Sequence, residues 1–113
     1  MRFEWDEEKN RQNRNKHGVS FETAALVFND PYALTKRDEI HDVEERFVTL
    51  GAIAPGAILL VVHTSFVSAG SEEVIRNISA RAATSRERKT YEETHKATET
   101  RNRRYRGKER RRH

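Results

Sequence analysis

The sequence predicts an α+β domain in which helices pack on an antiparallel sheet of four or five strands. Two observations predict it. Helical signals are confined to the first and last thirds of the chain, and short segments with strand character fill the middle. The connections between those segments are short enough for antiparallel neighbours. The expected order of elements is β-α-α-β-β-β-β-α, and 113 residues suffice for one domain with a single small core.

The first strand and helix follow from local signals. A strand over Arg2–Trp5 places Phe3 and Trp5 on one face. Asp6 suits a helix N-cap, and Gly18 suits the end of the same helix. The intervening EEKNRQNRNKH contains no apolar residue, so it has no apolar stripe to pack on a core. We expect this helix to be frayed, or kept for its polar face.

The remaining elements have clearer patterns. Ser20 is the N-cap candidate of an amphipathic helix that ends at Asn29-Asp30-Pro31. A capping box, Thr84-Ser-Arg-Glu87, begins a charged helix that continues beyond Tyr91. The apolar residues of the amphipathic helix are Phe21, Ala24, Ala25 and Phe28, and the strands between the two helices are predicted over Tyr32–Lys36, Arg46–Leu50, Ala57–Phe66 and Glu73–Ala80.

Charge divides the chain into a body and a tail. The whole chain has 22 Lys+Arg and 18 Asp+Glu, a net charge of +4. Residues 95–113 hold nine of the cations and two of the acids, so they carry +7 and residues 1–94 carry −3. Only Ala97 and Tyr105 are apolar after residue 94. We expect one folded domain over residues 1–93 and a basic extension over residues 94–113, either disordered or a helical continuation from Thr84. An arginine-rich arm that binds nucleic acid is one interpretation of it.

Several classes of protein are excluded. The chain has no cysteine, which rules out disulfides, a thiolate zinc site and a cysteine nucleophile. The longest apolar run, Ala57–Val62, is far shorter than the ~20 residues that cross a bilayer. The first residues contain no apolar signal segment. We expect a cytoplasmic protein.

The polar helix forms the first candidate cluster. Its cations can share a face and meet phosphates, although a solvated helix surface explains them equally simply. The residues are Lys9, Arg11, Asn13, Arg14, Lys16 and His17.

A second cluster surrounds His41. A histidine beside carboxylates can act as a general base, and together with His63 it could bind a metal, but no HExxH or HxH spacing favours a metal. An acidic hairpin loop is the simpler interpretation. The neighbours are Asp42, Glu44, Glu45 and Arg46.

The third cluster is Arg76-Asn-Ile-Ser-Ala-Arg81. Strand periodicity predicts Asn77, Ser79 and Arg81 on one face and Arg76 on the other. Arginine suits bidentate contact with phosphate, and the following helix adds more cations at Arg86 and Arg88. Ion pairs with Glu72 or Glu87 are the alternative use of these arginines.

Three stretches resemble the BrnT family of toxins from type II toxin–antitoxin pairs: FEWDEEKNRQNRNKHGVSFETAALVFNDP, EERFVTLG and VIRNISARAATSRERKTYEE. The resemblance covers residues 3 to about 93. It implies a RelE-like fold, RNA cleavage that inhibits translation, and neutralisation by a BrnA-like antitoxin with a ribbon-helix-helix domain, through which the complex reaches operator DNA. Residues 94–113 lie beyond the family's usual end, and the stretch TSFVSAGS lacks an arginine often found there.

These observations lead to a hypothesis of a metal-independent endoribonuclease without a cofactor. The ribose 2′-OH attacks the adjacent phosphate, which requires a base, an acid and cations on the phosphorane. A non-catalytic module that binds nucleic acid or antitoxin is the main alternative, and a DNA-binding regulator acting through the tail is another. We expect Arg76 and Arg81 as the phosphate clamp with Arg46, proton transfer by His63, His41 or Glu45, and flanking phosphate contacts from Lys16, His17, Arg86 and Arg88.

Overall fold

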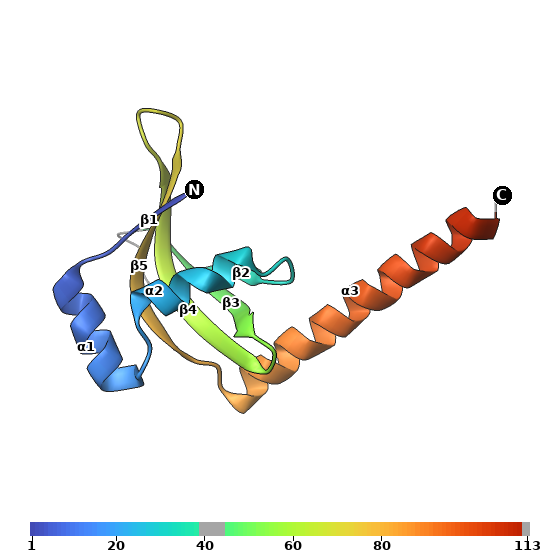
Figure 1. Ribbon diagram of the computed structural model, residues 1–113, viewed down its shortest axis with the longest axis horizontal. Helices are drawn as coiled ribbons and strands as arrows, with labels where there is room; N and C mark the ends of the chain where they lie inside the picture. The colour runs from blue at the N-terminus through green and yellow to red at the C-terminus, as the bar shows by residue number, and fades with distance from the viewer. Residues whose placement is uncertain (39–44, 112–113) are drawn as a thin grey trace.

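The protein is built on a five-stranded sheet in the order β1-β5-β4-β3-β2 (Figure 1). The computed structural model describes residues 1–38 and 45–111, with side chains as far as residue 98. In chain order, the elements are β1 (Arg2–Glu4), α1 (Glu7–His17), α2 (Phe21–Ala24), the 3₁₀ helix η1 (Ala25–Asn29), β2 (Leu34–Asp38), β3 (Arg46–Ala54), β4 (Ala57–Val67), β5 (Glu73–Ala82) and α3 (Ser85–Arg111).

The strand pairing confirms the predicted antiparallel strands and adds one parallel pair. Strands β2 to β5 pair in sequence order, each antiparallel to the next. Strand β1 lies parallel to β5, with Phe3 beside Ile75. The expectation of a wholly antiparallel sheet is therefore wrong at this edge, because β1 joins the last strand of the meander. The fold class remains α+β.

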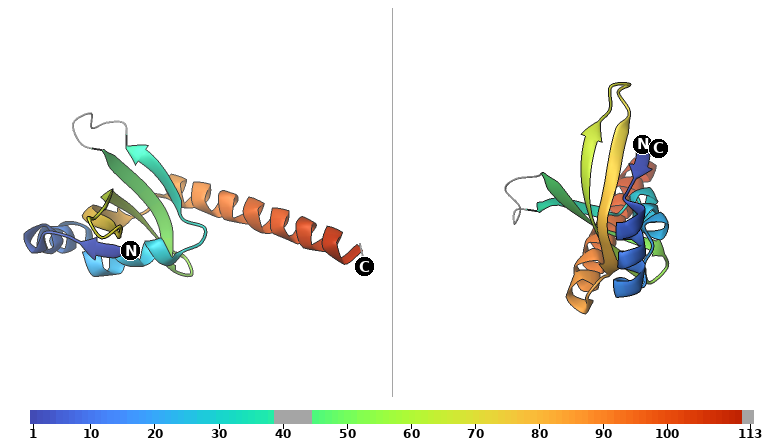
Figure 2. Two further views of the ribbon diagram at one scale, coloured as in Figure 1. Left: turned by 90° about the horizontal axis from the view of Figure 1, so that it is seen from above. Right: turned by 90° about the vertical axis from the view of Figure 1, so that its left-hand side faces the viewer.

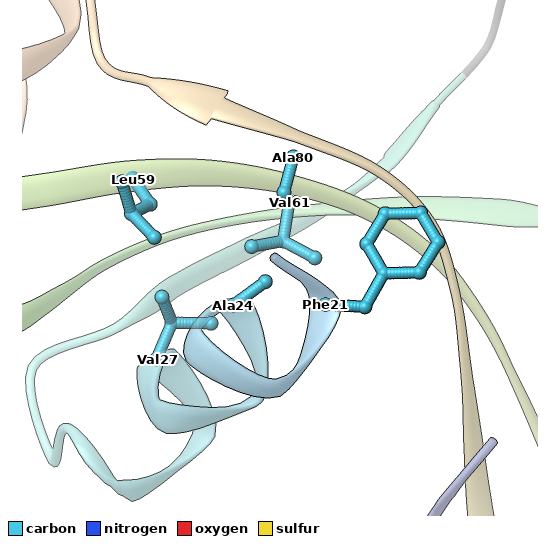
Figure 3. Close-up of a cluster of buried hydrophobic side chains, with 6 residues drawn as sticks. All are labelled: Phe21, Ala24, Val27, Leu59, Val61 and Ala80. Carbon is cyan, nitrogen blue, oxygen red and sulfur yellow. The ribbon is translucent and has the colours of Figure 1, made fainter. Parts of the chain in front are cut away.

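One core cluster lies between the sheet and the second helical segment (Figure 3). The predicted apolar face of that segment is confirmed at Phe21 and Ala24, and Phe28 is partly buried against them. Ala25 is not part of the cluster and Val27 is, because the α-helix gives way to a 3₁₀ helix at Ala25, whose side chains repeat every three residues. Gly51 allows this turn to lie close to β3, since a Cβ there would be 3.0 Å from Val27 Cβ. The buried members of the cluster are Phe21, Ala24, Val27, Leu59, Val61 and Ala80.

The first turns of α3 pack on the opposite face of the sheet. Tyr91 forms a second buried cluster with Leu50 and Ile58. Its hydroxyl donates to Asp30 Oδ2 at 2.6 Å, and Ala52 N donates to the same oxygen at 2.9 Å. Burial opposes ionisation of Asp30, but these hydrogen bonds hold its pKa below the ordinary value. Asp30 thus joins the end of η1 to both β3 and α3.

Helix α1 is attached to the domain by two buried asparagines. Asn13 Nδ2 donates to Ala80 O at 2.8 Å, and Ala80 N donates back to Asn13 Oδ1 at 3.1 Å. One turn earlier, Asn10 Oδ1 accepts from Phe21 N at 2.8 Å. The helix without an apolar residue is therefore ordered, and amide hydrogen bonds replace the missing apolar stripe.

Helix α3 is a single helix that continues through Arg111 (Figure 1). Residues 94–111 continue the helix that begins after Thr84, which is one of the two alternatives expected for this part of the chain. Figure 1 and the left view of Figure 2 show its second half extending away from the sheet, on the side opposite α1. Within the described part of the chain, no helix is long and apolar enough to span a membrane.

The hydrogen bonds of Asn13 lead to a stability prediction. Asn13→Ala should lower the free energy of unfolding by about 2–4 kcal/mol, because the buried N–H and C=O of Ala80 lose their partner. Asn15→Ala is the matched control, since Asn15 is exposed on the same helix, and it should change stability by less than about 0.5 kcal/mol. Urea denaturation of the two variants measures both values. Equal midpoints would contradict the role given to Asn13.

A second prediction concerns His63, which is 3 % exposed beside Thr49. Burial lowers the pKa of His63 below its ordinary value of 6.5. The unfolded chain then binds a proton that the folded chain rejects, so stability should fall as the pH drops below about 6.5, by at most about 1.4 kcal/mol per pH unit. Urea midpoints between pH 7.5 and 5 should show this slope, and His63→Gln should flatten it. A slope unchanged by the substitution would refute the assignment.

Candidate functional site

A β-bulge in β5 decides which side chains share a face of the sheet. Val62 pairs with Ser79, whereas the next residue, His63, pairs with Asn77, so Ile78 is the extra residue. The bulge shifts the alternation by one position. The predicted separation of Arg76 from Ser79 and Arg81 is therefore wrong: all three lie on the face opposite α2, and Asn77 lies on the α2 face.

Two contacts confirm this assignment of faces. Asn77 Nδ2 donates to Phe21 O at 3.2 Å, on the side where α2 packs. Arg81 forms an ion pair with Glu87 of α3, which packs on the other side. The bulge thus directs Arg76 and Arg81 toward the same side of the sheet as α3.

The register places the three predicted arginines of the sheet in rows that run across the strands. In the first row, Asp38 pairs with Arg46 and Thr64 pairs with Arg76. Because Phe47 pairs with His63, Arg46 lies beside Thr64. The next row is Lys36, Val48, Val62 and Ser79, and the third is Leu34, Leu50, Leu60 and Arg81.

We call the part of these rows that α3 leaves uncovered the open face. Its six central side chains are all half-buried. Adjacent strands are about 4.8 Å apart, so the backbones at Arg46 and Arg76 are about 10 Å apart with Thr64 between them. This spacing lets both guanidinium groups reach one phosphate placed over Thr64. The six residues are Arg46, Val48, Val62, Thr64, Arg76 and Ser79.

Arg76 is held loosely. Its Nη1 lies 3.4 Å from Glu4 Oε1, and the two side chains are 43 % and 38 % exposed. A single long contact between exposed groups contributes little to stability. Arg76 can therefore exchange its carboxylate partner for a phosphate at small cost.

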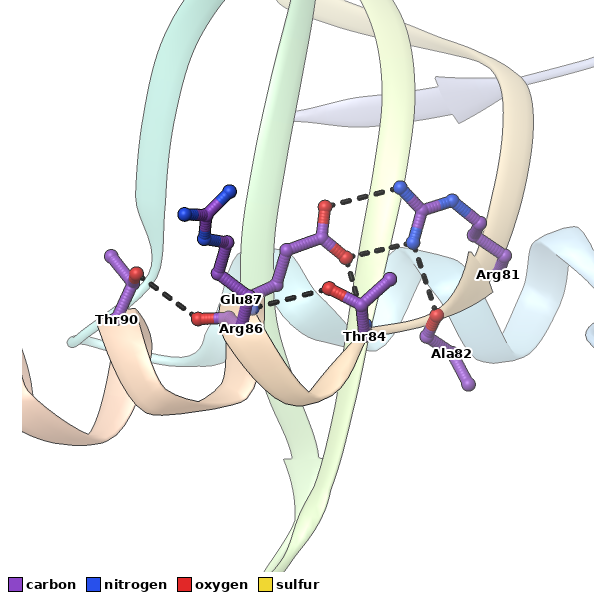
Figure 4. A network of polar contacts seen from close by, with 6 residues as sticks. All are labelled: Arg81, Ala82, Thr84, Arg86, Glu87 and Thr90. Carbon is purple, nitrogen blue, oxygen red and sulfur yellow. Dashed lines mark hydrogen bonds and ion pairs between the residues drawn. The ribbon is translucent and has the colours of Figure 1, made fainter.

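Arg81 is held firmly (Figure 4). Its Nη1 and Nη2 donate to the two Glu87 carboxylate oxygens at 2.7 and 3.1 Å. Glu87 also accepts from Thr84 N at 2.8 Å, which confirms the predicted capping box. The hydrogen bonds from Arg81, with those from Thr84, lower the pKa of Glu87 to about 2. The alternative use of Arg81 as an ion-pair partner is thus present in the free protein.

His63 lies on the other face of the sheet, away from the arginines. Its ring is 4.9 Å from that of Phe28 and 5.9 Å from that of Phe47, and Nε2 is hydrogen-bonded to Thr49 Oγ1 at 2.7 Å. Burial disfavours its protonated form. The structure therefore does not bring His63 together with the proposed phosphate site.

The other candidates are distributed over the molecule. Glu45 is exposed and directly precedes Arg46 at the start of β3. His41, with Asp42 and Glu44, lies outside the described residues. Lys16 and His17 lie in the last turn of α1, and Arg86 and Arg88 are exposed in the first turns of α3. The described residues contain no group of three metal-ligating side chains.

Two members of the first row, which contains Arg46 and Arg76, were not predicted from the sequence. Thr64 lies between Arg46 and Arg76, and Glu4 pairs with Arg76 from β1. The signal for Thr64 was its alternation with the apolar residues of β4. Glu4 could not be placed without knowing that β1 pairs with β5.

Comparisons with known proteins agree with this architecture. A family described as "Ribonuclease toxin, BrnT, of type II toxin-antitoxin system" matches residues 5–87. Among solved structures, the chain is similar to the Brucella abortus ribonuclease toxin BrnT, with 26 % sequence identity and a TM-score of 0.52 over 74 % of this chain and 97 % of that chain. No curated protein matches. The chain belongs to the BrnT family of ribonuclease toxins of type II toxin–antitoxin systems.

Proposed function

We propose that this protein is an endoribonuclease that cleaves RNA on the open face without a metal ion. The observation that carries the proposal is the row in which Arg46 and Arg76 flank Thr64 across three adjacent strands. Two arginines on a half-buried sheet surface form a preorganised site for a phosphate. They are worth most where negative charge develops in the transition state.

The proposed reaction uses the ribose of the substrate as nucleophile. The 2′-oxygen bonds to the adjacent phosphorus, the bond from phosphorus to the 5′-oxygen breaks, and a cyclic 2′,3′-phosphate and a 5′-OH remain. One protein group takes the proton from the 2′-OH, and another returns a proton to the 5′-oxygen. Glu45 and His41 precede Arg46 in the chain and are the groups proposed for proton transfer.

Arg81 is the third proposed contributor, with a different role. It lies two rows from Arg76 and its guanidinium is already occupied by Glu87. A substrate phosphate would have to replace the Glu87 carboxylate to reach Arg81. We therefore expect Arg76 and Arg46 to act on the reacting phosphate and Arg81 to act on a neighbouring one, with Arg86 and Arg88 of α3 beyond it.

A binding module without catalysis is the second candidate. Two observations favour it: the ion pair of Arg81 with Glu87, and the lack of a histidine in the three rows that the described residues form. Such a module would keep the fold and the antitoxin surface. The cleavage assay below separates the two candidates.

The catalytic proposal predicts the effect of removing Arg76. Arg76→Ala should lower the cleavage rate by about 10²–10³-fold, the usual loss for one electrostatic stabiliser of a transition state. The matched control is Arg11→Ala, which removes an exposed cation of α1 paired with Glu8 and should leave the rate unchanged. Cleavage of a fluorescent RNA in EDTA measures both rates, and a 2′-O-methyl RNA should stay intact.

Three outcomes would contradict this account. Full activity of a folded Arg76→Ala protein would remove Arg76 from the site. Loss of wild-type cleavage in EDTA would refute the metal-free mechanism. Binding without cleavage of RNA by the wild-type protein, together with no growth arrest on expression, would favour the binding module.

We also propose that the protein acts in the cytoplasm by inhibiting translation, and that a ribbon-helix-helix antitoxin neutralises it. Membership in a type II family supports a protein antitoxin as partner. The open face combines Arg46, Arg76 and Lys36 with the apolar Val48 and Val62. An acidic segment with apolar side chains would complement that surface and block RNA. Contact with operator DNA would then occur only through the antitoxin.

Charge reversal tests the antitoxin surface. Lys36→Glu should weaken the complex with the antitoxin on the order of tenfold, because it places like charges against each other. Lys9→Glu, at an exposed position of α1, should have no such effect. Titration calorimetry with the antitoxin measures both. Equal affinities, or equal RNA cleavage by free and antitoxin-saturated protein, would place the antitoxin elsewhere.

A further inference from the structure

The second half of α3 is a strongly basic helix. We call residues 99–111 the arm. The arm contains seven cations and two acids, a net charge of +5, and six of the cations are arginine. We propose that the arm binds the phosphate backbone of the single-stranded RNA that occupies the open face. This inference rests on the proposed function, because it extends the same substrate beyond the sheet.

The arm lies outside what the family shares. The family match ends at residue 87. The match to the Brucella abortus toxin covers 97 % of that toxin but only 74 % of this chain. Among the described side chains of α3, those up to residue 98, Tyr91 is the one that belongs to a buried cluster. The family match does not account for the length and the charge of the helix beyond it.

The first turns of α3 fix where the arm begins. Tyr91 packs on Leu50 and Ile58, on the same side of the sheet as the open face. One turn later, the ring of His95 lies 3.9 Å from that of Tyr32. The arm therefore leaves the body beside the start of β2, on the side of the sheet that carries the open face. An RNA strand that crosses the sheet from Arg76 on β5 toward β2 can continue toward it.

Length and charge fit a phosphate backbone. Thirteen helical residues rise about 1.5 Å each, so the arm extends about 20 Å. The seven cations average about two per helical turn over that length. Residues 1–94 carry −3 and would repel RNA on average, so the arm supplies the long-range attraction that the body lacks.

Nucleic acid fits the arm better than an acidic protein does. A protein partner for a helix needs an apolar stripe to bury. Within the arm, Tyr105 is the one large apolar or aromatic residue. Guanidinium groups form the planar bidentate contacts that phosphates accept, and a single tyrosine among them can stack on an unpaired base.

The experiment measures the salt dependence of RNA binding in the full chain. The probe is a fluorescein-labelled 20-nucleotide 2′-O-methyl RNA, which resists cleavage through the 2′-oxygen. Charges are removed from the arm by the triple substitution Arg103→Gln, Arg104→Gln and Arg106→Gln. The matched control, which we call the body control, removes three exposed cations that belong to none of the candidate clusters, Arg2→Gln, Arg37→Gln and Lys89→Gln.

The arm variant should bind the RNA more weakly and with a flatter salt dependence. Each lost phosphate contact lowers the slope of log K against log salt by about 0.7, so three contacts lower it by about 2 and raise Kd at 0.1 M salt by about 100-fold. The body control should keep the wild-type slope. Cleavage at saturating RNA should persist in the arm variant. If the proposed function itself is wrong, the wild-type chain will not cleave RNA either, so the two failures can be told apart.

Four results would overturn the inference. Parallel salt slopes for the wild type and the arm variant would show that the arm makes no phosphate contact. An equal change in the body control would show that the effect comes from net charge alone. Tighter binding of duplex DNA than of the RNA through the arm would assign it to another nucleic acid. Unchanged RNA binding with weakened antitoxin binding would assign it to the protein partner.

Discussion

The interaction on which the rest of the structure depends is the pair of hydrogen bonds between the Asn13 amide and the backbone of Ala80. The Asn13 amide makes the two hydrogen bonds to Ala80 that a residue of a neighbouring strand would otherwise make. It satisfies the edge of β5 beyond the point where β1 ends, and it holds α1 against the sheet. Asn10 then fixes the start of α2 through Phe21 N. A helix with no apolar residue thereby closes one side of the core, because a buried amide that satisfies two backbone groups replaces an apolar contact.

The same strand that Asn13 secures carries the bulge on which the proposed site depends. The extra residue, Ile78, turns Arg76 and Arg81 to one face, where Arg46 joins them from β3. Without it, strict alternation would divide the two β5 arginines between a solvated surface and the packed side of α2. The core explains why the bulge persists: it also places Asn77 and Ala80 together on the α2 side, where Asn77 donates to Phe21 O. Packing on one face therefore determines the charge on the other.

Glu87 links stability to the proposed activity. It caps α3 through Thr84 and neutralises Arg81 with two hydrogen bonds. In the protein without RNA, Arg76 is therefore more accessible to a phosphate than Arg81 is. Under the proposed function, RNA that reaches Arg81 must compete with the Glu87 carboxylate, whose pKa is about 2. In the same proposal, the basic arm attracts the RNA and the arginines of the sheet contact the reacting phosphate.

The sequence by itself determined the class of fold, the order of the elements, the capping box at Thr84 and the family, because these depend on the spacing of nearby residues and on long contiguous motifs. It also identified the arginines of the proposed site and Glu87 as a competing partner. Only the tertiary structure decided how they are used. The bulge at Ile78, the parallel pairing of β1 and the burial of His63 each depend on contacts between residues far apart in the chain. A two-residue period cannot reveal an inserted residue, and an apolar count cannot reveal that two asparagines hold a helix in place.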